Sequence, residues 1–165
     1  MSYFFTSDEH YGHAAIIKHC NRPFENVEEM NAEIIRRHNE IVGVNDITVH
    51  AGDFCWVRNI AGATEYIKKL KGNHIFIKGS HDKWLPASAK YMWRKMIEGQ
   101  LVVACHYAMR TWERACHGSW QVYGHSHGQL LPVGSQYDVG VDCNNFYPVS
   151  FDLLRTIIME NNNES

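Results

Sequence analysis

The feature that most constrains this chain is a set of five polar clusters, each of which directly follows a short apolar run. The clusters occupy residues 8–10, 52–53, 79–82, 106 and 124–127. Apolar runs of this length, bounded by glycine and polar residues, are typical of buried strands. Because ligands bind beyond the carboxyl ends of strands in open α/β sheets, we predict that the five clusters converge on one cleft.

The predicted order of elements alternates strands and helices early and contains mostly strands late. Residues 26–42 predict a helix that packs one face on a sheet, with Asn26 as N-cap and Glu29 in the capping-box position. This order predicts an α/β sandwich with mixed sheets. The other predicted strands cover residues 3–7, 46–52, 74–79, 101–106, 119–125 and 136–142, the other predicted helices cover 60–70 and part of 87–97, and 151–159 is a short helix or strand.

The composition is typical of a soluble globular domain. With 165 residues, 45% of them hydrophobic, the chain suits one domain over residues 1–160 and a frayed tail over 161–165. The formal net charge of -2 gives no broad attraction to nucleic acid or membranes, although it is compatible with a small basic groove. Five cysteines without CxxC spacing, with neither a signal peptide nor a membrane-spanning apolar run, predict a cytoplasmic protein.

The residue types in the clusters indicate a metal site. One histidine after a strand is usually structural, and one aspartate after a glycine usually forms a turn, but turns do not explain five such clusters. Carboxylates and imidazoles together suit Mn, Fe, Zn or Ni, and the lack of thiolates among them argues against a structural zinc site. Gly52, Gly79 and Gly124 are predicted to let the backbone pass close to an ion or a phosphate.

The ordered series of clusters resembles the signature of the calcineurin-like metallophosphoesterases, which reads Asp-x-His, Gly-Asp, Gly-Asn-His-Asp, His and Gly-His-x-His. Here the series reads "DEH", "GD", "GSHD", "CH" and "GHSH" and spans nearly the whole chain. The stretches "SDEHYGHAAII", "CNRPF" and "GSWQVYGHSHG" are similar to the small, compact bacterial and phage phosphoesterases of that superfamily. The resemblance implies a four-layer α/β/β/α sandwich with two mixed β-sheets and a dinuclear metal centre.

The resemblance also implies a ligand for each metal position. Asp53 would bridge the two ions. Ser80 stands where the family has an asparagine ligand, and its side chain is shorter by about 1.5 Å, on a metal–oxygen bond of about 2.1 Å. The loop could move inward, a water could bridge, or the second metal could bind weakly, and we predict two metals of which the second is labile. The first metal would be held by Asp8, His10 and His127, and the second by His106 and His125.

Two divalent ions in such a site, with manganese favoured, would share a hydroxide that attacks phosphorus. His81 is not needed as a ligand, so we predict that it protonates the leaving oxygen or stabilises the transition state. Asp82 is predicted to orient the His81 ring, and the alternative is a plain helix cap over the following residues.

Contacts with the substrate are predicted at three further residues. His13, Arg22 and Arg110 are candidates for binding the substrate phosphate, although a buried, capping or salt-bridged role is as compatible with each. Trp56, Tyr107 and Trp112 follow the site residues and either form a wall of the cleft or pack in the core. His50 is predicted to lie in a strand behind the centre, and Asp142 either caps a turn or lines the cleft.

Three functions compete at this point. The leading hypothesis is a metal-dependent phosphoesterase that acts on diesters or small monoesters in an open cleft. The motifs are not separated by a long insertion, so we expect no cap domain over this cleft. The second is a nuclease or cyclic-nucleotide phosphodiesterase of the same chemistry, with a nucleotide or nucleic acid as substrate and no membrane partner. The third is a non-catalytic scaffold, as in a retromer subunit with this fold, and Ser80 is the residue that favours it.

Overall fold

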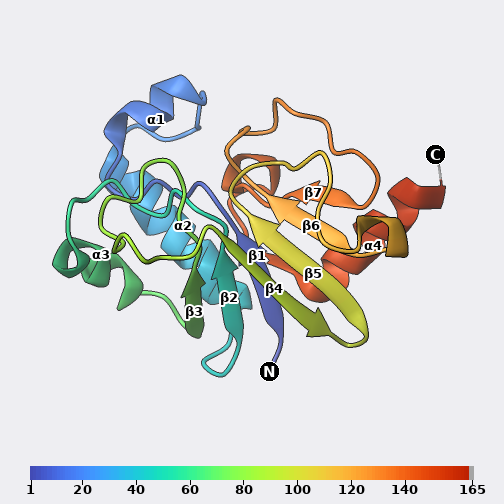
Figure 1. Cartoon of the computed structure of the whole chain (residues 1–165). Coiled ribbons are helices and arrows are strands. Elements are labelled where there is room, and N and C mark those ends of the chain that lie inside the picture. Colours follow the sequence, from blue (N-terminus) through green and yellow to red (C-terminus); the bar gives the residue numbers. More distant parts are fainter. Residues whose placement is uncertain (164–165) are drawn as a thin grey trace.

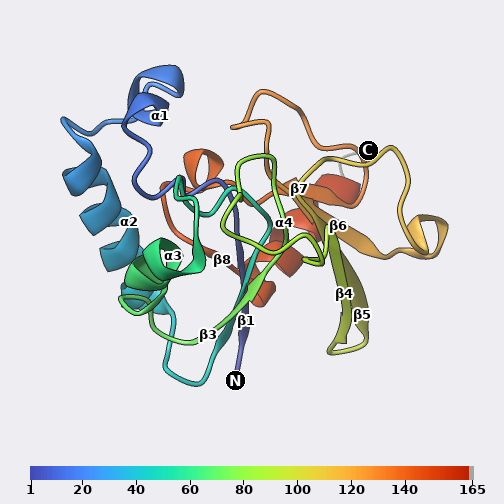
Figure 2. The same ribbon diagram turned by 60° about the vertical axis from the view of Figure 1, so that its left-hand side comes forward.

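The computed structural model describes residues 1–163, and two four-stranded sheets face each other at its centre (Figures 1 and 2). In each sheet three strands are parallel and one edge strand is antiparallel, so both sheets are mixed. The first sheet has the order β3 (Asn73–Phe76), β2 (Ile47–His50), β1 (Tyr3–Thr6) and β8 (Val149–Ser150). The second has the order β4 (Met92–Ile97), β5 (Gln100–Cys105), β6 (Trp120–Tyr123) and β7 (Gln136–Asp138).

The strand register brings the carboxyl ends together. Thr6 pairs with His50, and His50 pairs with Phe76, so β1, β2 and β3 end level with one another. In the second sheet β5 and β6 are parallel and also end at this edge, and a bridge between Ser7 and Gly140 joins the ends of β1 and β7. All five polar clusters therefore emerge at one edge of the double sheet.

The main core lies between the two sheets. Phe5 and Val49 from the first sheet meet Val102 and Val122 from the second, and all four are fully buried. Helix α4 (Phe151–Asn163) adds Leu154 and other apolar side chains to this core, next to the short strand β8.

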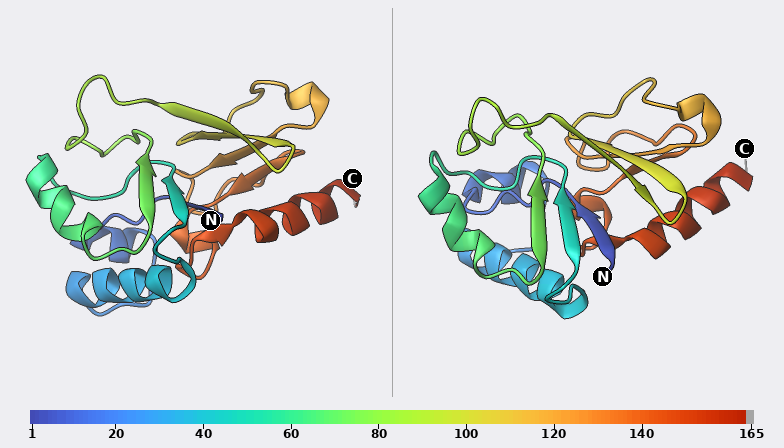
Figure 3. Two further views of the ribbon diagram at one scale, coloured as in Figure 1. Left: turned by 90° about the horizontal axis from the view of Figure 1, so that it is seen from below. Right: turned by 60° about the horizontal axis from the view of Figure 1, so that its bottom comes forward.

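Three helices form the layer on the outer face of the first sheet (Figure 3). They are α1 (Ala14–His19), α2 (Val27–Ile41) and α3 (Ile60–Ile67). Met30 and Ile34 of α2 are buried in a second core beneath this sheet, which confirms the predicted amphipathic helix. The Asn26 side chain accepts the Glu29 N–H as predicted, but Glu29 accepts from the Glu25 N–H, so the reciprocal half of the capping box is absent.

The outer face of the second sheet is contacted by the segment 107–118, which contains the short helix η1 (Ala115–His117). The buried side chain of Gln121 donates to Tyr107 O and accepts from the Met109 N–H, so it fastens this segment to β6. The predicted α/β class with two mixed sheets is confirmed, and this irregular segment forms the outer layer on the side of β6 and β7.

The predicted helix within residues 87–97 is wrong, because residues 92–97 form β4. Glu98 and Gly99 both have positive φ, 48° and 82°, as a two-residue type I′ hairpin turn requires. This turn pairs β4 antiparallel with β5. Residues 92–97 have no clear periodicity of their own, so their hydrogen bonds to β5 decide that they form a strand.

Other predictions of elements are completed or corrected by the structure. The last segment is a helix, and α4 continues to Asn163, so the predicted frayed tail 161–165 begins inside it, while 164–165 lie outside the described residues. Helix α1 and strand β8 were not predicted, since each is too short for a periodic pattern to show. The structure shows five free cysteines, and none of the helices within residues 1–163 is both long and apolar enough to cross a membrane.

Candidate metal centre

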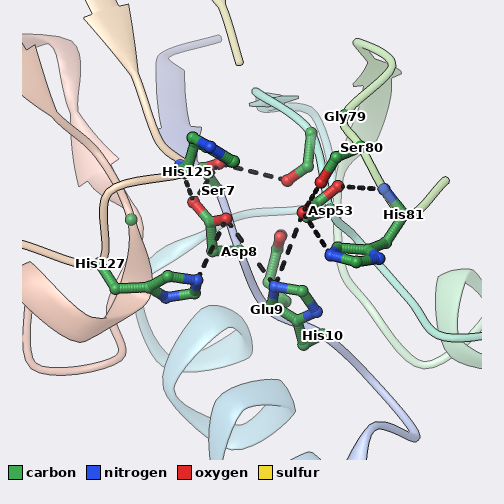
Figure 4. A network of polar contacts seen from close by, with 12 residues as sticks. Ser7, Asp8, Glu9, His10, Asp53, Gly79, Ser80, His81, His125 and His127 are labelled. Carbon is green, nitrogen blue, oxygen red and sulfur yellow. Dashed lines mark hydrogen bonds and ion pairs between the residues drawn. The ribbon is translucent and has the colours of Figure 1, made fainter. Parts of the chain in front are cut away.

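Two groups of side chains at the carboxyl edge bring their ligand atoms together (Figure 4). Within each group these atoms lie within 4.8 Å of one another. Each group draws residues from both sheets, and every member is a predicted ligand. The groups are Asp8, His10 and His127, and Asp53, His106 and His125.

In the first group, hydrogen bonds hold each ligand in a defined orientation. Asp8 Oδ2 accepts from the Ser7 hydroxyl at 2.7 Å and from the His125 N–H at 2.8 Å, which leaves Oδ1 facing the centre. His127 Nδ1 lies 2.7 Å from Asp142 Oδ2, so Nδ1 donates and Nε2 points at Asp8 Oδ1, 3.9 Å away. His10 Nε2 is 3.8 Å from the same oxygen.

The second group is arranged around Asp53. Its Oδ2 lies 3.3 Å from His106 Nε2 and 3.8 Å from His10 Nε2, so this carboxylate stands between the two groups as the predicted bridge would. His106 Nδ1 is 2.9 Å from the carbonyl oxygen of Ala51 and donates to it, which leaves the Nε2 lone pair free for a metal.

Buried atoms without partners show that this donor set fits cations. Asp8 Oδ1, His10 Nε2 and His106 Nε2 are all buried and have no hydrogen-bond partner within residues 1–163. Leaving such atoms unsatisfied costs about 1–3 kcal/mol each, unless something else binds them. All three face the space between the groups, and carboxylate oxygens with imidazole nitrogens are the ligands that divalent transition metals take.

The charges in the centre depend on burial. Burial raises the pKa of the Asp8 carboxyl to about 7, although His106 partly offsets this. Burial lowers the pKa of His10 to about 3, so its imidazole is neutral at neutral pH and its lone pair is available. Burial also opposes the charge of Asp53, but the adjacent His106 imidazole and the hydrogen bond from the His81 N–H outweigh it and hold the pKa of Asp53 below its usual value.

The backbone of the site is strained. Non-glycine residues with positive φ cost about 1–3 kcal/mol each and gather at functional sites, where the surrounding structure holds them in place. Five of the seven predicted ligands have such values: Asp8 (59°), His10 (53°), Asp53 (56°), His125 (68°) and His127 (46°).

Two glycines allow the ligand loops to approach one another. A Cβ at Gly79 would lie 2.2 Å from Asp53 Oδ1, and a Cβ at Gly124 would lie 2.2 Å from Asp8 Oδ2. No side chain fits at either position without displacing a predicted ligand. At these two glycines the backbone therefore passes close to the side chains of the predicted ligands Asp53 and Asp8.

Ser80 lies beside the second group. Its hydroxyl donates to Asp53 Oδ2 at 2.9 Å, so it contacts the predicted bridging carboxylate. Whether it also contacts a metal, directly or through water, stays a prediction.

His81 lies at the mouth of the centre, as predicted for a residue that is not a ligand. Its Nε2 is 3.9 Å from Asp53 Oδ2, and 41% of its side chain is exposed. Its backbone N–H donates to Asp53 Oδ1 at 2.7 Å, which fixes the position of the residue.

Asp82 has a different role from the predicted one. Its buried carboxylate accepts from the N–H groups of Asp53, Phe54 and Gly79 at 2.7–3.0 Å and from the Trp84 indole at 2.9 Å. These four donors, and not the His81 ring, surround it. The next element along the chain is the strand β4, so the helix-cap alternative is also wrong. Asp82 joins the loops after β2 and β3, a role that becomes visible only when the loops are adjacent in space.

A cleft of about 650 Å³ opens over the metal groups, between α1 and the loop 125–130. His13 lines it, with Nδ1 3.2 Å from His10 Nδ1, and its ring stacks on the exposed Trp56 at 4.0 Å. Trp56 and Tyr107 contact residues of the site but do not line this cleft, and the Tyr107 ring stands edge-on to His125 at 4.7 Å. His13 thus remains a candidate for binding substrate.

The two predicted arginine contacts are not available in this structure. Arg22 is buried, and its guanidinium donates to both oxygens of Asp142 at 2.8 Å and to the carbonyls of Asp8 and Glu9. It therefore supports the loop after β1. Arg110 lines a separate surface pocket with Trp112, and neither residue lines the cleft.

Two supporting contacts were not predicted. Asp142, which the sequence leaves open, orients His127 and binds Arg22, and these contacts lower its pKa although burial opposes this. Glu9 points away from the cleft and binds His50 Nδ1 at 2.5 Å, so His50 lies behind the centre as predicted. The only signal in the sequence is that both acids directly follow strands.

A third group that could hold an ion is formed by Cys20, His127 and Asp142. Burial raises the pKa of the Cys20 thiol to about 11, and the Asp142 carboxylate is already bound to Arg22. Because Arg22 and His127 already occupy both oxygens of Asp142, we assign no ion to this group.

No protein-family model matches the chain. The chain is 36% identical to the uncharacterized protein MJ1445 of Methanocaldococcus jannaschii, over 94% of this chain and 90% of that protein. Among solved structures, the protein of unknown function AQ665 from Aquifex aeolicus superposes with a TM-score of 0.72 at 19% identity, over 95% of this chain and 99% of that one. A single mutant of Vps29 from Entamoeba histolytica superposes with a TM-score of 0.51 at 16% identity, over 85% of this chain and 73% of that one.

Proposed function

The chain belongs to the same family as the uncharacterized protein MJ1445 and has a metallophosphoesterase-like fold, and on this basis we propose that it is a metal-dependent phosphoesterase. Its substrates are phosphodiesters or small phosphomonoesters. One observation carries the proposal: three buried atoms without partners in the described chain, on Asp8, His10 and His106, belong to the two ligand groups whose members His10 and Asp53 line the cleft. A structural site would enclose its ion fully, whereas this site opens onto a cleft.

The residues divide between two divalent ions, with Mn favoured and Fe, Zn or Ni also compatible with the ligands. Asp53, whose Oδ2 lies between His10 and His106, would be shared by both positions, and Ser80 donates a hydrogen bond to it. When bound, the ions would lower the pKa of the attacking water and neutralise negative charge on the phosphoryl oxygens. The first position is formed by Asp8, His10 and His127, and the second by His106 and His125.

The chain itself supplies orientation and a proton. Burial keeps His10 neutral, and the Asp142 carboxylate holds His127 in the tautomer that presents Nε2. His81, half exposed at the cleft and held through its backbone to Asp53, donates a proton to the leaving oxygen.

The test is Mn²⁺-dependent hydrolysis of bis-p-nitrophenyl phosphate and p-nitrophenyl phosphate, with metal content measured on the same samples. Asp53→Asn should lose both activity and metal, because the carboxylate contacts both positions. His81→Ala should keep its metal and lose about 100-fold or more in kcat, as for a general acid. His117→Ala, at an exposed histidine of η1, should change neither.

Full metal loading in Asp53→Asn would contradict the ligand assignment. Metal loss in His81→Ala would make that residue a ligand. A metal-loaded wild type that is inert on both esters with Mn, Fe, Zn and Ni would favour the scaffold alternative.

A further inference from the structure

A second, smaller pocket adjoins the cleft on the far side of His81. It has a volume of about 110 Å³ and is lined by Trp56, Val57, Arg58, His81 and Lys83. His81 lines both this pocket and the main cleft, so its imidazole stands between the metal centre and the smaller pocket.

The pocket carries positive charge without a partner. Arg58 and Lys83 are both exposed, and neither takes part in an ion pair within residues 1–163. Most other arginines in that part of the chain do pair with acids, such as Arg22, Arg36 and Arg94. No acidic side chain of the described chain lines the pocket. Two cations at a concave site next to an aromatic wall favour an anionic group.

The wall of the pocket is held in place. The Trp56 ring stacks on His13 at 4.0 Å and 12° and lies 4.9 Å from the His81 ring. The backbone N–H of Trp56 donates to the carbonyl of Tyr11 at 2.8 Å. Trp56 is nevertheless 46% exposed, so part of its ring is accessible to a group bound in the pocket.

The size of the pocket limits what it holds. Its volume of about 110 Å³, against about 650 Å³ for the main cleft, suits a small anionic group such as one phosphate or carboxylate. A polynucleotide backbone would have to continue beyond the pocket, so its size favours a terminal group.

We propose that this pocket binds a second anionic group, a phosphate or a carboxylate, carried by the leaving group of the substrate. The inference rests on the proposed function, since it takes His81 as the group that protonates the leaving oxygen. In hydrolysis the bond from phosphorus to the leaving oxygen breaks, one from phosphorus to the oxygen of water forms, and the leaving oxygen takes a proton from His81. The part of the substrate beyond His81 is then the leaving group, and Arg58 and Lys83 bind its charge.

The experiment compares α,ω-alkanediol bisphosphates of three to six carbons with the corresponding monophosphates. The wild type should show a KM about tenfold lower for at least one bisphosphate than for its monophosphate, with an optimum in spacer length. The variant with both Arg58→Ala and Lys83→Ala should lose this difference, while its kcat and its KM for the monophosphates stay within about twofold. Lys95→Ala, at an exposed lysine of β4, serves as the control and should leave the preference unchanged.

Equal KM values for bisphosphates and monophosphates in an active wild type would overturn the inference and leave the proposed function standing. If no ester is hydrolysed, the proposed function and the leaving-group assignment fail together, and calorimetry with alkane bisphosphonates and monophosphonates decides whether the pocket binds an anion. Binding that is equally tight in the wild type and the double variant would overturn it. Cleavage of an oligonucleotide that depends on Arg58 and Lys83, without any preference for bisphosphates, would assign the pocket to a nucleic acid instead.

Discussion

At the scale of single residues, the site depends on which atom of each ligand is left without a partner. Hydrogen bonds occupy Asp8 Oδ2, His106 Nδ1 and His127 Nδ1, so the opposite atom of each side chain faces the centre. Ser80 differs, because its hydroxyl donates a hydrogen bond to Asp53 instead of holding a ligand atom toward the centre. A hydroxyl in that position reaches less far than an amide would, which underlies the prediction that the second metal is labile.

We expect Ser80→Asn to bind the second metal more tightly. The longer side chain reaches further toward His106 and His125, and gains in metal affinity of about 10–100-fold are typical of an added supporting contact. The measurement is the Mn²⁺ dependence of bis-p-nitrophenyl phosphate hydrolysis, together with the number of ions bound at equilibrium. Ser80→Ala serves as the comparison that removes the hydroxyl without adding reach. Identical metal dependence in all three proteins would show that the loop already compensates at this position.

At the scale of elements, the loops after β2 and β3 act as one unit. Asp82 joins them, because its carboxylate accepts N–H groups from Asp53 and Phe54 on one loop and Gly79 on the other. The β4–β5 hairpin also depends on contacts between segments, since pairing between the two strands decides its structure.

We expect Asp82→Asn to destabilise the fold by about 3 kcal/mol, since a buried amide presents its own donor to these N–H groups. Metal affinity should fall with it, because Asp53 is displaced. Urea unfolding and metal titration measure the two effects, and Asp152→Asn, at an exposed acid on α4, is the matched control. Unchanged stability with a loss of turnover alone would instead support the original prediction that Asp82 orients His81.

At the scale of the whole molecule, a group of three histidines lies between α2 and the first sheet, and two of them, His38 and His50, are buried. His50 Nε2 lies 3.0 Å from His74 Nδ1, and His38 Nε2 is 3.0 Å from the carbonyl oxygen of Lys71. Burial lowers the pKa of His38 and of His50 to about 3 and that of His74 to about 4. The three therefore stay neutral in the folded protein at pH values where they are protonated in the unfolded chain.

We expect the metal-free protein to lose stability as the pH falls below about 6.5, the pKa of histidine in the unfolded chain. Each lowered pKa contributes about 1.4 kcal/mol per pH unit between that value and the folded pKa, while above pH 6.5 it has no effect. Between pH 6.5 and 5, His38 alone should account for about 2 kcal/mol. Urea unfolding of the wild type and His38→Gln at both pH values measures this, and an equal loss in the two proteins would contradict it.

How far the sequence predicts the site depends on whether a feature is local. The polar residues that directly follow strands form the centre as predicted, because strand ends and their loops are set by neighbouring residues. The predicted substrate contact at Arg22 fails, because its partner Asp142 lies 120 residues away. The strand β4 was missed for the same reason, since its hydrogen bonds are made to another strand.

The sequence by itself therefore determined the α/β class, six of the eight strands described in residues 1–163 and the identity of the residues at their ends, since all of these follow from local patterns. The tertiary structure alone decided which atoms face the centre, that Asp82 and Arg22 support loops, and that Arg58 and Lys83 share a pocket with His81. Each candidate metal position combines residues from both sheets, and only their packing brings those residues within reach of one ion.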